Sequence, residues 1–100
     1  MNEEELIRKL NSVGKEKFVT YFDLFRDYSN GNLSREACIE RLVVENVSNE
    51  NGASIRCSNA KKIFDEGMSS DALEVVASSR KIHADIRNTA RERLLEQVDD

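Results

Sequence analysis

Apolar residues recur every three or four positions along most of this chain, which is the spacing of one face of an α-helix. The pattern is longest over residues 54–95, and we expect the rest of the chain to pack on the run 70–87 within it. Ser78 and Ser79 interrupt the pattern with side chains that compete for backbone hydrogen bonds. They predict a kink or a short turn over residues 79–83.

The same periodicity predicts four helices ahead of this run. They are expected from residue 2 or 3 to 13, over residues 15–29 and 35–45, and from residue 53 or 54 to 66. Gly14 and Gly67 are the expected caps at the carboxyl ends of the first and fourth helices, because glycine readily adopts a positive φ. Ser34 is the expected N-cap of the third helix, and Ser69 or Ser70 that of the helix after residue 67. On the third helix we expect the inward residues to be Ala37, Cys38 and Leu42, with Ile39 and Val43 as further candidates.

Five of the six aromatic residues fall in the expected helix over residues 15–29. They are Phe18, Tyr21, Phe22, Phe25 and Tyr28. A stripe of this kind can form a platform on which bases stack, a ligand pocket, or part of the hydrophobic core. Aromatic residues at helical spacing usually belong to the core. The pattern therefore predicts that the three phenylalanines are buried and that the two tyrosines lie at the edge with their hydroxyls in water.

The composition favours an all-α fold. The chain has no proline or tryptophan, with 39% hydrophobic and 34% charged residues, whereas a β-sandwich needs frequent turns and β-branched alternation. A chain of 100 residues is long enough to fold around its own core without disulfides or metals. We predict a single domain over residues 1–100, a compact bundle of five short helices, or six if the last one breaks near His83. Residues 46–53 are expected to form a flexible loop, and residues 97–100 to fray.

No apolar run approaches the roughly 20 residues that cross a bilayer. The acidic start Met1-Asn-Glu-Glu-Glu also lacks the basic and apolar regions of a signal peptide. We therefore expect a cytoplasmic protein with no membrane partner, in which Cys38 and Cys57 are reduced.

No motif in the chain is typical of a catalytic, cofactor or metal site. Residues 26–37 have the glycine rhythm of an EF-hand loop, but the first, third and twelfth positions lack the oxygen donors that calcium needs. Two cysteines and one histidine are one ligand short of a structural zinc site. A catalytic pair of His83 with Cys38 or Cys57 is disfavoured, because both cysteines lie in apolar stripes where thiols are usually inert. We expect neither an enzyme nor a cofactor.

The net charge of −4 is unevenly distributed: residues 1–53 carry −3, residues 54–93 carry +2 and residues 94–100 carry −3. The positive charge therefore gathers around the last predicted helix. If that helix is regular from residue 80 onward, its apolar stripe is formed by Ile82, Ile86, Ala90 and Leu94, and a basic edge by Arg80, Arg87 and Arg91.

The basic edge of Arg80, Arg87 and Arg91 predicts docking of an acidic partner, either a protein or a phosphate group. The alternative is an ordinary solvated helix face, since arginine covers apolar surface while its charge stays in water. The function that we predict is that of a small non-enzymatic interaction module or regulator that binds another protein.

A nucleic-acid-binding regulator is the second hypothesis. Residues 63–80, with Gly67 at the turn, match part of the pattern of a DNA-binding helix-turn-helix, although Asp71 and Glu74 on its second helix would repel phosphates. The basic residues assigned to this hypothesis are Lys61, Lys62, Arg80, Lys81 and Arg87. The sequence also allows a homodimer through the apolar stripe of the last helix, extended by Leu95 and Val98.

Overall fold

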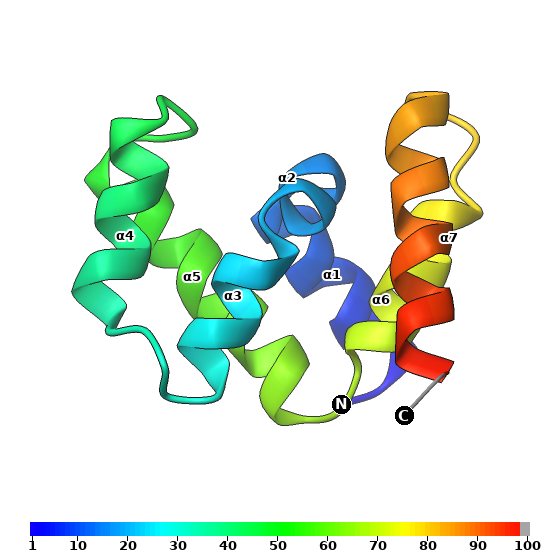
Figure 1. The fold of residues 1–100 in the computed structure, drawn as a ribbon, viewed down its shortest axis with the longest axis horizontal. Coiled ribbons are helices and arrows are strands. Elements are labelled where there is room, and N and C mark those ends of the chain that lie inside the picture. The colour runs from blue at the N-terminus through cyan, green and yellow to red at the C-terminus, as the bar shows by residue number, and fades with distance from the viewer. Residues whose placement is uncertain (99–100) are drawn as a thin grey trace.

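The computed structural model describes residues 1–98, and these form seven helices and no strand (Figure 1). The helices are α1 (Glu3–Val13), α2 (Lys15–Thr20), α3 (Phe22–Ser29), α4 (Arg35–Val44), α5 (Glu50–Asp65), α6 (Ser69–Ala77) and α7 (Ala84–Val98). The radius of gyration is 12.6 Å, close to the roughly 13 Å expected of a compact chain of this length. The all-α bundle is confirmed, with more helices than the five or six predicted.

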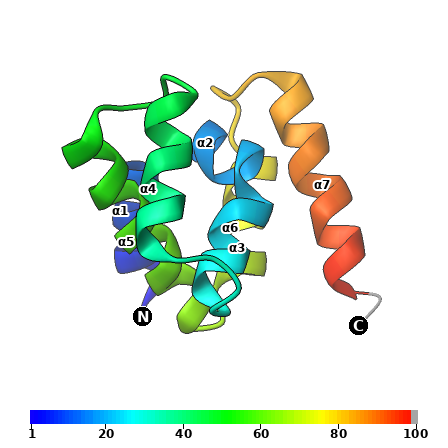
Figure 2. The same cartoon turned by 60° about the vertical axis from the view of Figure 1, so that its left-hand side comes forward.

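The longest helix, α5, packs against α1, α3 and α4, whereas α6 and α7 pack mainly against each other. The short helix α2 lies between these groups and contacts α1, α6 and α7. As a result α4 and α7 lie at opposite sides of the molecule, at the left and the right of Figure 1 and well apart in Figure 2. None of the helices described over residues 1–98 combines the length and the apolar composition that a membrane span requires.

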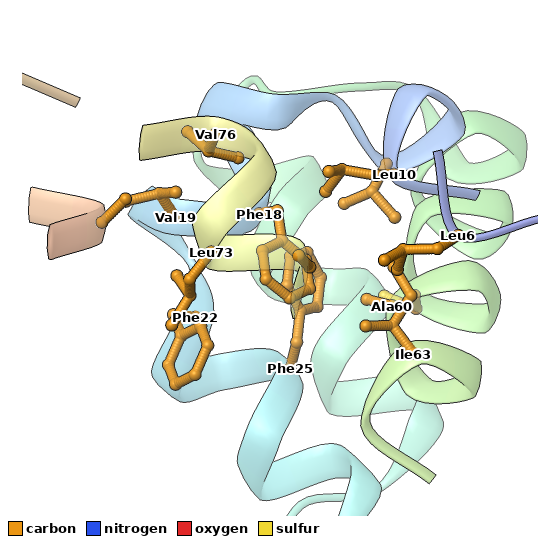
Figure 3. Close-up of a cluster of buried hydrophobic side chains, with 14 of the residues drawn as sticks. Leu6, Leu10, Phe18, Val19, Phe22, Phe25, Ala60, Ile63, Leu73 and Val76 are labelled. Atoms are coloured by element: carbon orange, nitrogen blue, oxygen red, sulfur yellow. The ribbon is translucent and has the colours of Figure 1, made fainter. Parts of the chain in front are cut away.

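The core is built around the predicted phenylalanine stripe (Figure 3). Phe18, Phe22 and Phe25 are each at most 1% exposed, as the spacing predicts. The Phe18 ring meets the Phe22 ring edge-on at 5.7 Å and stacks on the Phe25 ring at 6.4 Å. Phe64 from α5 closes the cluster by stacking on Phe18 at 5.7 Å. Both tyrosines of the stripe are half-buried, and each hydroxyl lies at the surface within hydrogen-bond distance of a charged side chain.

The helix predicted over residues 15–29 is divided in two. At Tyr21 the backbone leaves the helical region, with φ −106° and ψ 25°. The interruption lets α2 pack on α1 and α7 while α3 packs on α5 and α4. A tertiary requirement therefore overrides the regular helical periodicity of this segment.

The loop predicted over residues 46–53 is shorter in the structure, because α5 begins at Glu50. The side chain of Asn49 caps α5 by accepting a hydrogen bond from the Gly52 amide at 2.8 Å. At the other end of the connection, Asn46 adopts a positive φ of 60° and ends α4. Asn51 and Gly52, which fall inside the predicted loop, are thus part of the first turn of α5. Gln97 belongs to α7, and residues 99–100 of the segment expected to fray lie outside the described residues.

The predicted turn between the last two helices is confirmed: α6 ends at Ala77 and α7 begins at Ala84. The cap predicted at Gly67 is confirmed as well, with φ 71°. The Met68 amide donates back to the Ile63 carbonyl at 2.9 Å, which closes the end of α5. Neither serine predicted as the N-cap of α6 has that role, because this tight closure places the helix start directly after Met68.

Candidate functional site

The structure does not arrange the three predicted arginines along one helix edge. Arg80 lies in the connection before α7, so only Arg87 and Arg91 are on the helix. Arg91 donates hydrogen bonds to the Ala77 carbonyl at 3.3 Å and to Asn88 Oδ1 at 3.0 Å. Arg87 is half-buried, and its Nε has no hydrogen-bond acceptor among the described residues. The regular helix from residue 80 that the basic edge required is absent, because the chain turns at Ser78 and Ser79.

The basic residues assigned to nucleic-acid binding form two groups. Lys61 and Lys62 are near the end of α5, and Lys61 pairs with Asp65 at 2.6 Å. Arg80 and Lys81 lie beyond the other end of α6, a helix of 9 residues and therefore about 13 Å long. Arg87 follows one turn into α7. The structure therefore does not bring the five basic residues together.

The histidine and the cysteines considered as a catalytic pair also lie in different parts of the molecule. His83 lies exposed in the connection before α7, where its Nδ1 accepts a hydrogen bond from the Asp85 amide at 3.3 Å. Cys38 and Cys57 instead face each other in the interior between α4 and α5. Residues 1–98 contain no group of three or more histidine, cysteine, aspartate or glutamate residues placed to hold a metal ion.

The structure does show a surface groove between α4 and the start of α5, which we call the α4 groove. It has a volume of about 290 Å³ and is lined by Glu36, Ile39, Glu40, Val43 and Glu50. Ile39, Glu40 and Val43 follow Glu36 at intervals of three, four and seven residues, so all four lie on one side of α4. Val43 is 37% exposed, and the neighbouring Val44 is 68% exposed. The lining of the groove therefore combines two apolar side chains with three carboxylates.

The carboxylates of the α4 groove are not paired with a cation in the part of the chain that the structure describes. Within residues 1–98, none of Glu36, Glu40 and Glu50 forms an ion pair. Glu45, at the end of the same helix, is different: hydrogen bonds from Arg41 and then from Tyr21 lower the pKa of its carboxyl. The three groove carboxylates are thus free to meet cationic groups from outside the molecule.

A second hollow lies between α1 and α6. It is larger, about 460 Å³, and its acidic residues are Glu3, Asp71 and Glu74. Leu6, its apolar member from α1, is only 2% exposed, and its other apolar members Met68 and Val75 are half-buried. Since burial of exposed apolar surface drives association, the α4 groove is the better candidate for a docking site.

Sequence reasoning missed the α4 groove because it placed Ile39 and Val43 among the candidates for the interior. Ile39 is half-buried and Val43 exposed, since α4 packs mainly on α5 and leaves this side uncovered. The available signal was a glutamate ahead of each apolar residue along α4, with Glu36 before Ile39 and Glu40 before Val43. Comparisons with protein-family models, with curated proteins and with solved structures find no match to this chain.

Proposed function

We propose that the protein is a small cytoplasmic, non-enzymatic interaction module that binds a basic amphipathic helix of a partner protein in the α4 groove. The observation that carries this proposal is that the exposed Val43 shares a groove with three carboxylates that form no ion pair within residues 1–98. The cytoplasmic location and the absence of enzymatic activity are the expectations drawn from the sequence.

Two interactions favour a basic amphipathic helix in the α4 groove. Apolar side chains of a docked helix would remove Ile39 and Val43 from water, which supplies the favourable free energy of association. Lysine or arginine beside those side chains would pair with Glu36, Glu40 and Glu50, which favours a basic partner over an acidic one. An acidic helix in the same groove would face repulsion from every carboxylate.

The predicted arginine edge supports a weaker proposal. Arg91 already donates to a backbone carbonyl and Arg80 is off the helix, so they present no regular row to an acidic partner. Nucleic-acid binding has less support than protein binding, because Lys61 and Arg80 belong to groups at opposite ends of α6. A homodimer through Leu95, which is 68% exposed, remains an outcome to be tested.

The proposal is tested with two fluorescent peptides of about four helical turns. Both carry leucines at helical spacing, and they differ in having either lysine and arginine or glutamate at the flanking positions. We expect fluorescence anisotropy to detect binding of the basic peptide alone, weakened by added salt. Replacing Glu36, Glu40 and Glu50 together by glutamine should weaken binding about tenfold or more, a loss of about 1.4 kcal/mol.

The matched control replaces Glu3, Asp71 and Glu74 of the second hollow by their amides, which removes the same number of charges. This variant should bind the basic peptide as the unmodified protein does. Equal binding of both peptides, or binding of neither, would contradict the proposal. Retardation of a duplex DNA at low salt that disappears when Arg80 and Lys81 become glutamine would favour the nucleic-acid hypothesis instead.

A further inference from the structure

The two cysteines of the chain face each other inside the molecule. Cys38 Sγ on α4 and Cys57 Sγ on α5 are 2.9 Å apart, and both residues are 0% exposed. They are 19 residues apart in the sequence, and the chain contains no other cysteine. Any intramolecular disulfide must therefore join this pair, and it would tie α4 to the longest helix.

The distance between the two sulfurs is close to that of a disulfide bond. A disulfide has a sulfur–sulfur distance of about 2.05 Å, so the two sulfurs need to approach by about 0.9 Å. Hydrogen bonds already hold the helices together beside the pair, because Arg35 of α4 donates to Ser54 Oγ at 2.6 Å and to Ser58 Oγ at 2.9 Å. The folded chain thus keeps the two thiols at a high effective concentration.

We propose that Cys38 and Cys57 are a redox modification site, at which a disulfide oxidant such as glutathione disulfide joins α4 to α5 through a reversible disulfide. This inference is independent of the α4 groove. In a reducing compartment the pair stays as thiols, and the disulfide forms when the oxidised glutathione concentration rises.

The reaction proceeds by two exchanges. The Cys57 thiolate attacks one sulfur of glutathione disulfide, whose sulfur–sulfur bond breaks, and the departing glutathione takes up the proton that Cys57 lost. The Cys38 thiolate then attacks Cys57 Sγ, and the second glutathione leaves with the proton from Cys38. Two electrons pass from the protein thiols to glutathione disulfide, which is reduced to two glutathione molecules.

The order of the two exchanges follows from the surroundings of the sulfurs. A hydrogen bond from Cys38 and the positive charge of Arg35 lower the pKa of the Cys57 thiol, although burial opposes this shift. The hydrogen bond to Cys57 and burial raise the pKa of the Cys38 thiol. These opposite shifts in pKa favour Cys57 as the first nucleophile. Because both thiols are buried, the first exchange requires local separation of α4 from α5.

The test equilibrates the whole protein in glutathione buffers of increasing oxidised fraction, with and without denaturing urea. Mass spectrometry after acid quenching then counts the chains that have lost two hydrogen atoms. We expect the folded protein to form the disulfide at a glutathione disulfide concentration about tenfold lower than the unfolded protein requires, because folding holds the thiols together. The oxidised protein should also unfold at a higher temperature than the reduced protein.

The control variants are Cys38→Ser and Cys57→Ser, which keep one thiol each and should form only a mixed disulfide with glutathione. The unfolded protein verifies that the oxidant is competent. The proposal is overturned if the folded protein keeps two thiols under conditions that oxidise the unfolded chain. It is equally overturned if disulfide-linked dimers are the main product.

Discussion

Phe18 lies at the centre of the aromatic cluster and touches rings from two other helices. Its side chain is 0% exposed and contacts Phe22, Phe25 and Phe64. Replacing it by alanine removes the ring and leaves a cavity that neighbouring helices can fill only in part. We predict that Phe18→Ala lowers the free energy of unfolding by about 3–5 kcal/mol, measured by urea denaturation.

The matched control is Ile55→Ala on α5. Ile55 is 55% exposed, so its truncation should change the free energy of unfolding by less than about 0.5 kcal/mol. Similar losses for both variants would mean that the aromatic cluster is not the main source of stability.

Asp65 gives the fold a dependence on acid. Hydrogen bonds from Lys61 and then Ser29 lower the pKa of its carboxyl below the ordinary value. A lowered pKa in the folded protein stabilises the fold above about pH 4, and this stabilisation is lost as the pH falls through the folded-state pKa. We predict that acidification below about pH 4 lowers the free energy of unfolding less steeply in Asp65→Asn than in the unmodified protein.

The comparison for this prediction is Glu40→Gln, which alters a carboxylate that forms no ion pair within residues 1–98. Its acid dependence, followed by circular dichroism, should match that of the unmodified protein. An Asp65→Asn profile with the unmodified slope would show that the contacts with Lys61 and Ser29 do not stabilise the carboxylate.

At the scale of single residues, the sequence predicts the centre of the core better than its margin. Phe18 and Phe22 are buried because a large apolar side chain at helical spacing has few other favourable places. Val43 has the same apolar character but is exposed, since no helix covers that side of α4. The contact between Cys38 and Cys57 depends on how α4 crosses α5, which no local pattern encodes.

At the scale of the helices, α5 begins with an asparagine cap. Asn49 Oδ1 accepts the Gly52 amide, which would otherwise have no partner in the first turn. We predict that Asn49→Ala lowers the free energy of unfolding by about 1 kcal/mol, because the Gly52 amide loses its side-chain acceptor at the start of a helix that packs on both α1 and α4.

Asn49→Asp keeps the accepting oxygen and adds a negative charge at the amino end of the helix, so it should retain or raise stability. If alanine and aspartate at this position give equal thermal midpoints, α5 does not begin at Glu50 as described.

The connection between α6 and α7 is the most exposed basic segment outside a helix. Arg80 and Lys81 are exposed and lie three and four residues after the end of α6. We predict that brief trypsin treatment of the folded protein cuts first after these two residues, identified by mass spectrometry, because proteases need an extended and accessible backbone. Arg41 and Lys62, exposed within α4 and α5, serve as internal references. Earlier cleavage at either one would contradict separate helices α6 and α7.

The two helix breaks differ in whether the local sequence or the packing of neighbouring helices causes them. The interval between Ala77 and Ala84 was predictable, because Ser78 and Ser79 compete with the helix for hydrogen bonds. The break at Tyr21 was not, since the apolar residues on both sides of it keep one regular helical spacing and neither glycine nor proline is present there. Its cause is the packing of α2 and α3 on different neighbours.

At the scale of the whole molecule, α4 and α7 are separated by the core helices (Figure 1). The composition was enough to predict an all-α protein, because proline is absent and apolar residues follow a helical period. The composition was not enough to predict where a surface groove lies, since grooves arise where neighbouring helices diverge. The three arginines of the basic edge do not lie along one helix because the chain turns at Ser78 and Ser79, and the α4 groove is seen only in the folded structure.

Docking of a basic helix in the α4 groove is tested most directly by placing a photoreactive benzoylphenylalanine at position 43 of the protein in living cells of the source. A second variant carries the same group at position 55, which is also an exposed apolar site but lies outside the α4 groove. We predict a crosslink from position 43 alone, to a basic helical segment of another protein, and its loss when Glu36, Glu40 and Glu50 become glutamine. Equal crosslinking from both positions, or crosslinks from position 43 only to acidic segments or to a second copy of this chain, would contradict it.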